Sequence, residues 1–377
     1  MPTEKPLDMD IPPDIVSKLL LDARFSIFAM LNFEFPPIFD DTSIEQWPDE
    51  YFNEDSPSST DIRKIAQLPI PPTSVIGAII AAVKSNGYAL KAKSVNYAHT
   101  PDEQQTYPLW VISYWEGVLH LHDAHHMWSS ALESLKRSVT DEEVLQKSCE
   151  ALDNLPWSGK IQGFPSNSTG STTILSCYFT AQWLSEEHIN QILELLRDDL
   201  DANEKVSINI QDAYFFPKMK DGFVDQEKYT SSKVFRWCRE EGHNLETGVY
   251  DQLGFVVHIG GNHWVGVVCD FRKGVIWGGD SLANEFNKGV IKTLEWWTYF
   301  HSGRRFKFKA LPITRQTDVH SCGILACNAV AHFMLGNIAL VEANGVFTER
   351  LRIFHRVVDK HLEALVSFGP PMSLTRS

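Results

Sequence analysis

The cysteine at position 322 stands where a polar turn becomes an apolar helix. The segment from residue 318 reads DVHSCGILACNAVAHFML, in which Ser-Cys-Gly is followed by an almost uncharged run with helical spacing. The first turn of a helix has free backbone N–H groups, and the helix dipole favours an anion there. A thiol that only packs in the core would lie inside the helix, as Cys327 does. The position of Cys322 therefore predicts a thiolate, the form of cysteine that acts as a nucleophile.

A thiolate nucleophile needs a base that takes the proton, a group that orients the base, and donors for the oxyanion. His263 lies at the start of the strand-like segment HWVGVVCDF, and Asp280 ends the next one, GVIWGGD. A tight turn near Lys273-Gly274 would bring the start of the first strand beside the end of the second. We therefore expect His263 and Asp280 to be neighbours.

Gln316 is the candidate donor for the oxyanion, because it lies six residues before the cysteine in the same polar turn. Its side-chain amide can point an N–H group at an oxyanion beside the backbone N–H of Cys322. Each candidate also has a plain structural interpretation: a histidine at a strand boundary, an aspartate that forms a turn, and a glutamine in solvent. These three residues and Cys322, taken together in this order along the chain, predict cysteine-type catalysis.

The elements that must position these residues fall into two parts. Residues 1–157 begin with an acidic stretch containing prolines, which predicts partial disorder, and then become mainly helical. The helical segments of this region lie near 68–87, 108–136 and 140–153. A Gly/Ser/Thr-rich segment at 158–173 is the predicted linker. Residues 174–368 form the predicted catalytic domain, and 369–377 form a tail.

The second part mixes helices and strands. An amphipathic helix is predicted over 185–200, with Ser185 as its N-cap and two glutamates in its first turn. A helix near 284–301 and the buried helix from residue 322 follow later in the chain. The strand-like segments are VSINI, 253–259, 263–271, 274–280 and 304–313. This order predicts an α+β domain in which a small sheet packs against helices.

Composition and charge exclude several classes of protein. The 377 residues, 43% of them hydrophobic, are enough for one large globular domain or two ordinary ones. Six cysteines without paired spacing, and no secretory leader, predict an intracellular, reducing compartment, either nucleus or cytoplasm. No segment approaches the roughly 20 apolar residues of a membrane span. A formal net charge of −14 argues against nucleic acid as a partner.

The ordered set of His263, Asp280, Gln316 and Cys322 resembles the ubiquitin-like-protein-specific cysteine proteases, a family that includes the SUMO (sentrin) proteases and the adenoviral protease. Three helical segments extend the resemblance: QWLSEEHINQILELL at 182–196, KVFRWCREEG at 233–242 and TERLRIFHRVVDKHL at 348–362. The resemblance covers roughly residues 175–365. It implies a papain-like-clan α+β fold, with a small mixed sheet packed against helices.

The same resemblance assigns a role to each candidate. Cys322 is the nucleophile, His263 the base, Asp280 the carboxylate that orients the base, and Gln316 the oxyanion donor. The implied partner is SUMO or a related ubiquitin-like modifier, together with its conjugates, and the implied reaction is hydrolysis after the Gly-Gly C-terminus. No cofactor and no metal are implied, and the sequence leaves the oligomeric state open.

Two tryptophans match the family's tunnel for the Gly-Gly tail. Trp183 belongs to the opening Trp-Leu pair, and Trp264 directly follows the candidate base. The resemblance makes both substrate-binding residues. Alternation along the strand points Trp264 away from His263, so a packing role is the competing interpretation for this tryptophan.

The chain departs from the family pattern at three places. Ser185-Glu186 stands where the family commonly has Asn-Asp, at the edge that contacts the modifier, so the resemblance does not identify the modifier. Gly278-Gly279 precedes the candidate acid where an aromatic or apolar residue is usual, and two glycines could bulge the strand and shift the carboxylate. Ser321 replaces the aspartate that commonly precedes the nucleophile.

Two other functions use the same residues. A same-fold acyltransferase would need an acetyl-CoA site, and the tunnel tryptophans favour the protease over it. An inactive modifier-binding module is disfavoured by the intact Gln316 and Cys322. Outside the set, HLHDAHH at 120–126 places His122 and His126 at i,i+4 for zinc, but its Trp, Tyr and Leu neighbours favour the exposed edge of a helix.

Overall fold

The chain is divided into two units, each with its own apolar core. The computed structural model describes residues 9–34, 36, 52–85, 92–97, 105–166, 168–282 and 285–368. One unit comprises Met1–Ser130 with Leu152–Gly159, and the other comprises Ala131–Ala151 with Lys160–Ser377. The predicted tail at 369–377 and most of the acidic stretch predicted to be disordered, residues 37–51, lie outside the described residues.

The first unit contains helices and a small sheet. The helices are α1 (Pro13–Leu19), α2 (Ile27–Leu31), α3 (Ile62–Gln67), α4 (Thr73–Ser85) and most of α5 (Trp110–Ser138). The strands are β1 (Phe52–Asn53), β2 (Ser94–Tyr97) and β3 (Gln105–Pro108), which pair antiparallel in that order. The helices near 68–87 and 108–136 are confirmed by α4 and α5, and that near 140–153 by α6 (Glu142–Asn154). The sheet was not predicted, because strands of two to four residues are too short to show alternation.

The second unit holds the predicted α+β domain. Its helices are α7 (Glu186–Ala202), α8 (Phe215–Val224), α9 (Gln226–Ser231), α10 (Arg236–Glu246), α11 (Lys288–Ser302), α12 (Cys322–Leu335) and α13 (Val346–Phe368). Its strands are β4 (Ile208–Ile210), β5 (Gln252–Ile259), β6 (His263–Asp270), β7 (Val275–Gly279) and β8 (Lys307–Ala310). The sheet has the order β4-β5-β6-β7-β8, with parallel pairs at its two ends and antiparallel pairs in the middle. The predicted fold class is therefore confirmed.

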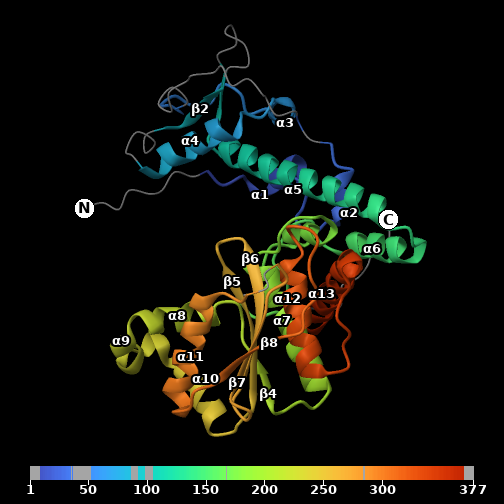
Figure 1. The fold of residues 1–377 in the computed structure, drawn as a ribbon. Coiled ribbons are helices and arrows are strands. Elements are labelled where there is room, and N and C mark those ends of the chain that lie inside the picture. Colours follow the sequence, from blue (N-terminus) through green and yellow to red (C-terminus); the bar gives the residue numbers. More distant parts are fainter. Residues whose placement is uncertain are drawn as a thin grey trace. The chain divides into compact units, whose positions relative to one another are not determined.

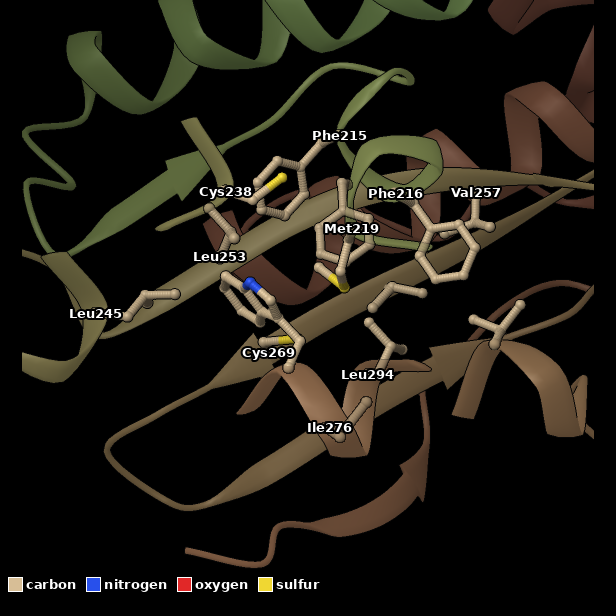
Figure 2. Packing of buried hydrophobic residues seen from close by; sticks show 14 of the residues in the cluster. Phe215, Phe216, Met219, Cys238, Leu245, Leu253, Val257, Cys269, Ile276 and Leu294 are labelled. Atoms are coloured by element: carbon tan, nitrogen blue, oxygen red, sulfur yellow. The ribbon is translucent and has the colours of Figure 1, made fainter. Parts of the chain in front are cut away.

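Helices cover both faces of this sheet (Figure 1). On one face α12 packs on β5 and β6, with α7 and α13 beside it, and on the other face α8 packs on β5 next to α10 and α11. Figure 2 shows the core on the second face, where Phe215 and Met219 of α8 point toward Leu253, Cys269 and the neighbouring strands. Buried layers on both faces thus enclose the middle of the sheet, where β6 begins with His263 and Asp280 directly follows β7.

The last predicted strand is shorter than expected. The pattern over 304–313 predicted a strand, but β8 covers only Lys307–Ala310. Among the described strands β8 pairs with β7 alone, and β7 has five residues, which limits the length of β8. Gly303, with φ of 63°, ends α11. The chain then turns toward the sheet over residues 304–306, before β8 begins at Lys307.

The segment 158–173, predicted to be a linker, carries buried residues in the second unit. Ile161 and Phe164 are buried, and Lys160 and Ser171 form an isolated antiparallel bridge. Among the described residues no helix is long and apolar enough to span a membrane.

Candidate active site

Cys322 is the first residue of α12, and a fixed turn places it there. The carboxylate of Asp318 accepts hydrogen bonds from the backbone N–H groups of His320 and Ser321, each at 2.8 Å, and from Ser321 Oγ at 2.6 Å. Partial burial alone would raise the pKa of Asp318, but these hydrogen bonds lower it below the usual value. The carboxylate of Asp318 therefore holds the turn in a fixed shape. Cys322, 2% exposed, follows this turn and begins the helix, where backbone N–H groups lack intrahelical partners.

The hairpin of β6 and β7 brings His263 and Asp280 together, as the sequence predicted. The strands pair from Gly266 with Gly279 to Asp270 with Val275. His263 Nε2 lies 2.8 Å from Asp280 Oδ1, and both side chains are largely buried. The same oxygen accepts the backbone N–H of Leu282 at 2.8 Å, so the carboxylate has two donors that fix its position.

The two glycines before Asp280 do not bulge the strand. Gly278 pairs with Val267 and Gly279 with Gly266 in continuous register. A Cβ on Gly278 would lie 2.5 Å from Cζ of Phe308, and one on Gly279 would lie 3.2 Å from Cβ of Leu311. The glycines therefore provide space for the chain that packs beside β7, and the carboxylate remains within hydrogen-bond distance of the histidine.

The Cys322 thiol lies near the imidazole of His263. The second ring nitrogen, Nδ1, is buried and has no hydrogen-bond partner among the described residues. Burial alone would lower the pKa of His263, but Asp280, which is hydrogen-bonded to the ring, and the nearby Cys322 raise it to about 9. A pKa in this range favours the protonated ring at neutral pH.

Gln316 is buried and has a defined orientation. Its backbone N–H donates to the carbonyl of Ser281 at 3.1 Å, its Nε2 donates to the carbonyl of Asp318 at 2.8 Å, and its Oε1 accepts from Ser281 Oγ at 2.5 Å. The side-chain amide has two N–H hydrogens, so one remains for a ligand after the bond to Asp318.

These contacts connect the residues around Cys322 in one series. Its members, in order, are His263, Asp280, Ser281, Gln316, Asp318 and Ser321, each joined to the next by a hydrogen bond or by chain adjacency, and Ser321 directly precedes Cys322. The arrangement offers a thiol, a protonated base with its carboxylate, and an amide donor around the first turn of α12. Chemically, these are the groups that attack a carbonyl and stabilise the resulting oxyanion.

The two predicted substrate-binding tryptophans lie beside the segment that carries Cys322. Trp183 is 49% exposed, and its indole N–H donates to the carbonyl of Val319. Trp264 is 3% exposed, donates to the carbonyl of Leu184 at 3.1 Å, and lies so close to Gly323 that a Cβ there would be 3.4 Å from its ring. The indole of Trp183 is therefore accessible to a ligand, and the indole of Trp264 is buried beside the start of α12.

Sequence reasoning missed several residues that support this site. His258 stacks on Trp264 with ring centroids 4.3 Å apart, and its Nδ1 lies 3.5 Å from Oε1 of Glu186. His258 pairs directly with Trp264 across the sheet, a relationship that needs the register of β5 and β6. Asp318 was also missed, although Asp-x-x-Ser before a helix is the usual pattern of a side-chain-capped turn.

The histidine-rich segment at 120–126 lies within α5, and His125 Nε2 is 3.2 Å from the carbonyl of Leu31. In the part of the chain that the structure describes, no group of three or more His, Cys, Asp or Glu side chains is arranged to hold a metal ion.

Comparison with known proteins identifies the domain. Residues 182–345 match the family described as the Ulp1 protease family, C-terminal catalytic domain. This part of the chain therefore matches the Ulp1 family of cysteine peptidases, which is the family predicted from the sequence. No curated protein matches the sequence.

Several solved structures are similar to part of the chain. The C-terminal Ulp1 protease domain in complex with Smt3, the yeast orthologue of SUMO, is 16% identical with a TM-score of 0.47, over 59% of this chain and 96% of that one. The Ulp1-like SUMO protease catalytic domain of Chaetomium thermophilum is 14% identical, with a TM-score of 0.37, over 66% and 92%. The Xanthomonas campestris effector XopD bound to ubiquitin is 17% identical, with a TM-score of 0.33, over 46% and 91%. These TM-scores are below 0.5, so the assignment rests on the family match.

Proposed function

We propose that this protein is a thiol protease that hydrolyses the bond after the C-terminal Gly-Gly of SUMO or a related ubiquitin-like modifier. The observation that carries the proposal is the placement of His263, hydrogen-bonded to Asp280, and of Gln316 near Cys322 at the start of α12, in a part of the chain that matches the Ulp1 family. A thiol used only for packing has no need of a protonated histidine beside it.

In the proposed mechanism Cys322 and His263 form a thiolate–imidazolium pair. The thiolate attacks the carbonyl carbon of the terminal glycine, and the oxyanion accepts hydrogen bonds from the side-chain N–H of Gln316 and the backbone N–H of Cys322. His263 then gives its proton to the leaving amine as the thioester forms. Water, deprotonated by the now neutral histidine, hydrolyses the thioester and regenerates the thiol. Asp280 holds the ring in place and stabilises its positive charge throughout.

Specificity for glycine would come from the two tryptophans. The exposed indole of Trp183 and the buried indole of Trp264 flank the residues on either side of Cys322. A tail that passes between two large rigid rings close to the nucleophile has no room for side chains. The proposed site therefore accepts Gly-Gly and rejects larger residues.

The two tryptophans predict different defects. Trp183→Ala should raise KM for a modifier precursor by about 10- to 100-fold with little change in stability, because a half-exposed aromatic contact is lost. Trp264→Ala should lower the free energy of unfolding by about 3 to 5 kcal/mol, because its ring is buried. Steady-state kinetics and denaturant unfolding measure the two effects. Tyr299→Ala, which removes an equally exposed aromatic side chain from α11, is the control and should change neither.

Cleavage of modifier precursors tests the proposal. SUMO and ubiquitin precursors with a short C-terminal extension are incubated with the full chain, each in a Gly-Gly form and in a form whose last glycine is alanine. Cleavage of one Gly-Gly precursor, with loss of cleavage in its alanine form, is the expected result. If no precursor of either modifier is cleaved, the proposed substrate class is wrong, and an acyltransferase or a binding module replaces it.

We also propose that the protein acts in the nucleus or cytoplasm. The proposed reaction needs Cys322 as a free thiol, and these reducing compartments keep thiols reduced. Cell fractionation followed by immunoblotting tests this location.

A further inference from the structure

We propose that Ser281 is the positioning residue for the oxyanion donor, and that it ties Gln316 to the carboxylate that orients the base. This inference rests on the proposed function, since it concerns how the same site stabilises its oxyanion. Ser281 touches neither the nucleophile nor the base in the described contacts, so its effect must pass through Gln316.

The hydrogen bonds fix which way the amide of Gln316 points. The carbonyl oxygen of Asp318 can only accept, so the atom 2.8 Å away from it must be Nε2 and not Oε1. Oε1 therefore faces Ser281, and the hydroxyl of Ser281, 2.5 Å away, must donate. With the amide in this orientation, one N–H of Nε2 is bound to Asp318 and the other is available to an oxyanion.

A second contact makes the attachment rigid. The backbone carbonyl of Ser281 accepts the backbone N–H of Gln316 at 3.1 Å, so the two residues are joined twice. Arg315 Nη1 also donates to the carbonyl of Asp280 at 3.2 Å. The two chain segments around Asp280 and Gln316 are thus held together by three contacts.

Because the site is buried, Oε1 of Gln316 depends on the hydroxyl of Ser281 for a hydrogen-bond donor. Ser281 is 1% exposed and Gln316 is 9% exposed, so water has little access to replace a missing donor. Without the hydroxyl, Oε1 of Gln316 would be a buried acceptor without a partner, which is unfavourable because the group has lost its water and gained no donor. The amide would turn to find another donor, and the N–H aimed at the oxyanion would be lost.

The position of Ser281 in the chain adds a second consequence. Asp280 orients His263, and the very next residue orients Gln316. A single dipeptide at the end of β7 therefore sets the geometry of both the base and the oxyanion donor. A displacement of this dipeptide would disturb proton transfer and oxyanion stabilisation together.

A double-mutant cycle tests the inference. Ser281→Ala should lower kcat by about 10- to 100-fold with little change in KM, and Gln316→Ala should lower it by about 100- to 1,000-fold, as for loss of one oxyanion donor. The double variant should be no slower than Gln316→Ala, because Ser281 acts only through that amide. Ser281→Thr keeps the hydroxyl and should restore most of kcat. Alkylation of Cys322 by iodoacetamide needs no oxyanion donor, so its rate should be the same in wild type and Ser281→Ala.

A second readout does not depend on turnover. The side-chain amide resonances of Gln316 are identified in ¹⁵N NMR spectra of the full chain by their loss in Gln316→Ala. In the wild-type protein they should show slow hydrogen exchange, and in Ser281→Ala the exchange should become fast. The inference is overturned if Ser281→Ala leaves exchange unchanged, or if the losses in kcat multiply in the double variant. A wild-type protein that cleaves no modifier yet shows the expected exchange would contradict the proposed function alone.

Discussion

Replacing Cys322 by alanine is expected to lower kcat for modifier hydrolysis by about 10,000-fold or more. The thiolate forms the covalent thioester, and no neighbouring group among the described residues can take over that step, so only weak residual catalysis would remain. The substitution should leave the fold intact, because alanine fits the start of α12 and removes only a sulfur atom. Initial rates on the Gly-Gly precursor, measured with far-ultraviolet circular dichroism as a check of folding, give the result.

Cys327→Ala provides the matched control. Cys327 lies five residues further along the same helix, where burial raises its pKa above the ordinary value for a thiol. A buried thiol of this kind stays neutral and is inert. Cys327→Ala should therefore keep kcat within about two-fold of the wild-type value, at a small cost in stability. Activity above about 1% of wild type in Cys322→Ala, or an equal loss in both variants, would show that Cys322 is not the nucleophile.

Replacing Asp280 by asparagine is expected to change both the rate and its pH dependence. Asparagine keeps the size of the side chain but removes the charge that stabilises the imidazolium. We expect kcat to fall by on the order of 100-fold or more, because proton transfer through His263 becomes less favourable.

The direction of the pH shift follows from the causes of the histidine's pKa. Asp280 and Cys322 raise the pKa of His263 from 6.5 to about 9, against burial, which lowers it. The imidazolium is the form that donates the proton, so activity is present below this pKa and is lost as the pH rises through it. In Asp280→Asn the pKa of His263 falls, and the alkaline limb of kcat/KM should move from near pH 9 toward neutral pH.

Asp251→Asn is the control for this experiment. Asp251 directly precedes β5, at the end of the strand opposite to Ile259, which pairs with His263, and its carboxylate is 3.6 Å from Arg272. Its pH profile should match that of the wild-type protein. An alkaline limb that stays in place in Asp280→Asn would mean that the carboxylate does not set the pKa of His263.

Local patterns were enough to predict the parts of the site that depend on neighbouring elements. The turn near Gly274 joins two strand-like apolar segments, so the hairpin that brings His263 beside Asp280 follows from the sequence. The polar turn before an uncharged helix likewise placed Cys322 at a helix start. In both cases the geometry is set within one hairpin or one turn, where sequence spacing and distance in space correspond.

Contacts between distant segments could not be predicted in this way. The bond from Ser281 to Gln316 crosses 35 residues, and it depends on how the end of β7 meets the turn before α12. The stacking of His258 on Trp264 depends on strand register, which a one-residue slip would destroy. The glycines before Asp280 suggested a bulge in the strand. In the structure they instead leave room for the side chains that pack beside β7, which come from residues 308 and 311.

Covalent capture by a modifier probe shows directly whether Cys322 attacks the end of a ubiquitin-like protein. The full chain is incubated with SUMO and ubiquitin that carry a C-terminal propargylamide in place of the last glycine, and the products are analysed by intact mass and peptide mapping. We predict one adduct with the mass of one modifier, attached at Cys322, and no adduct in Cys322→Ala. An adduct on another cysteine, or no adduct with either modifier, would contradict the claim that Cys322 attacks the Gly-Gly end of a ubiquitin-like protein.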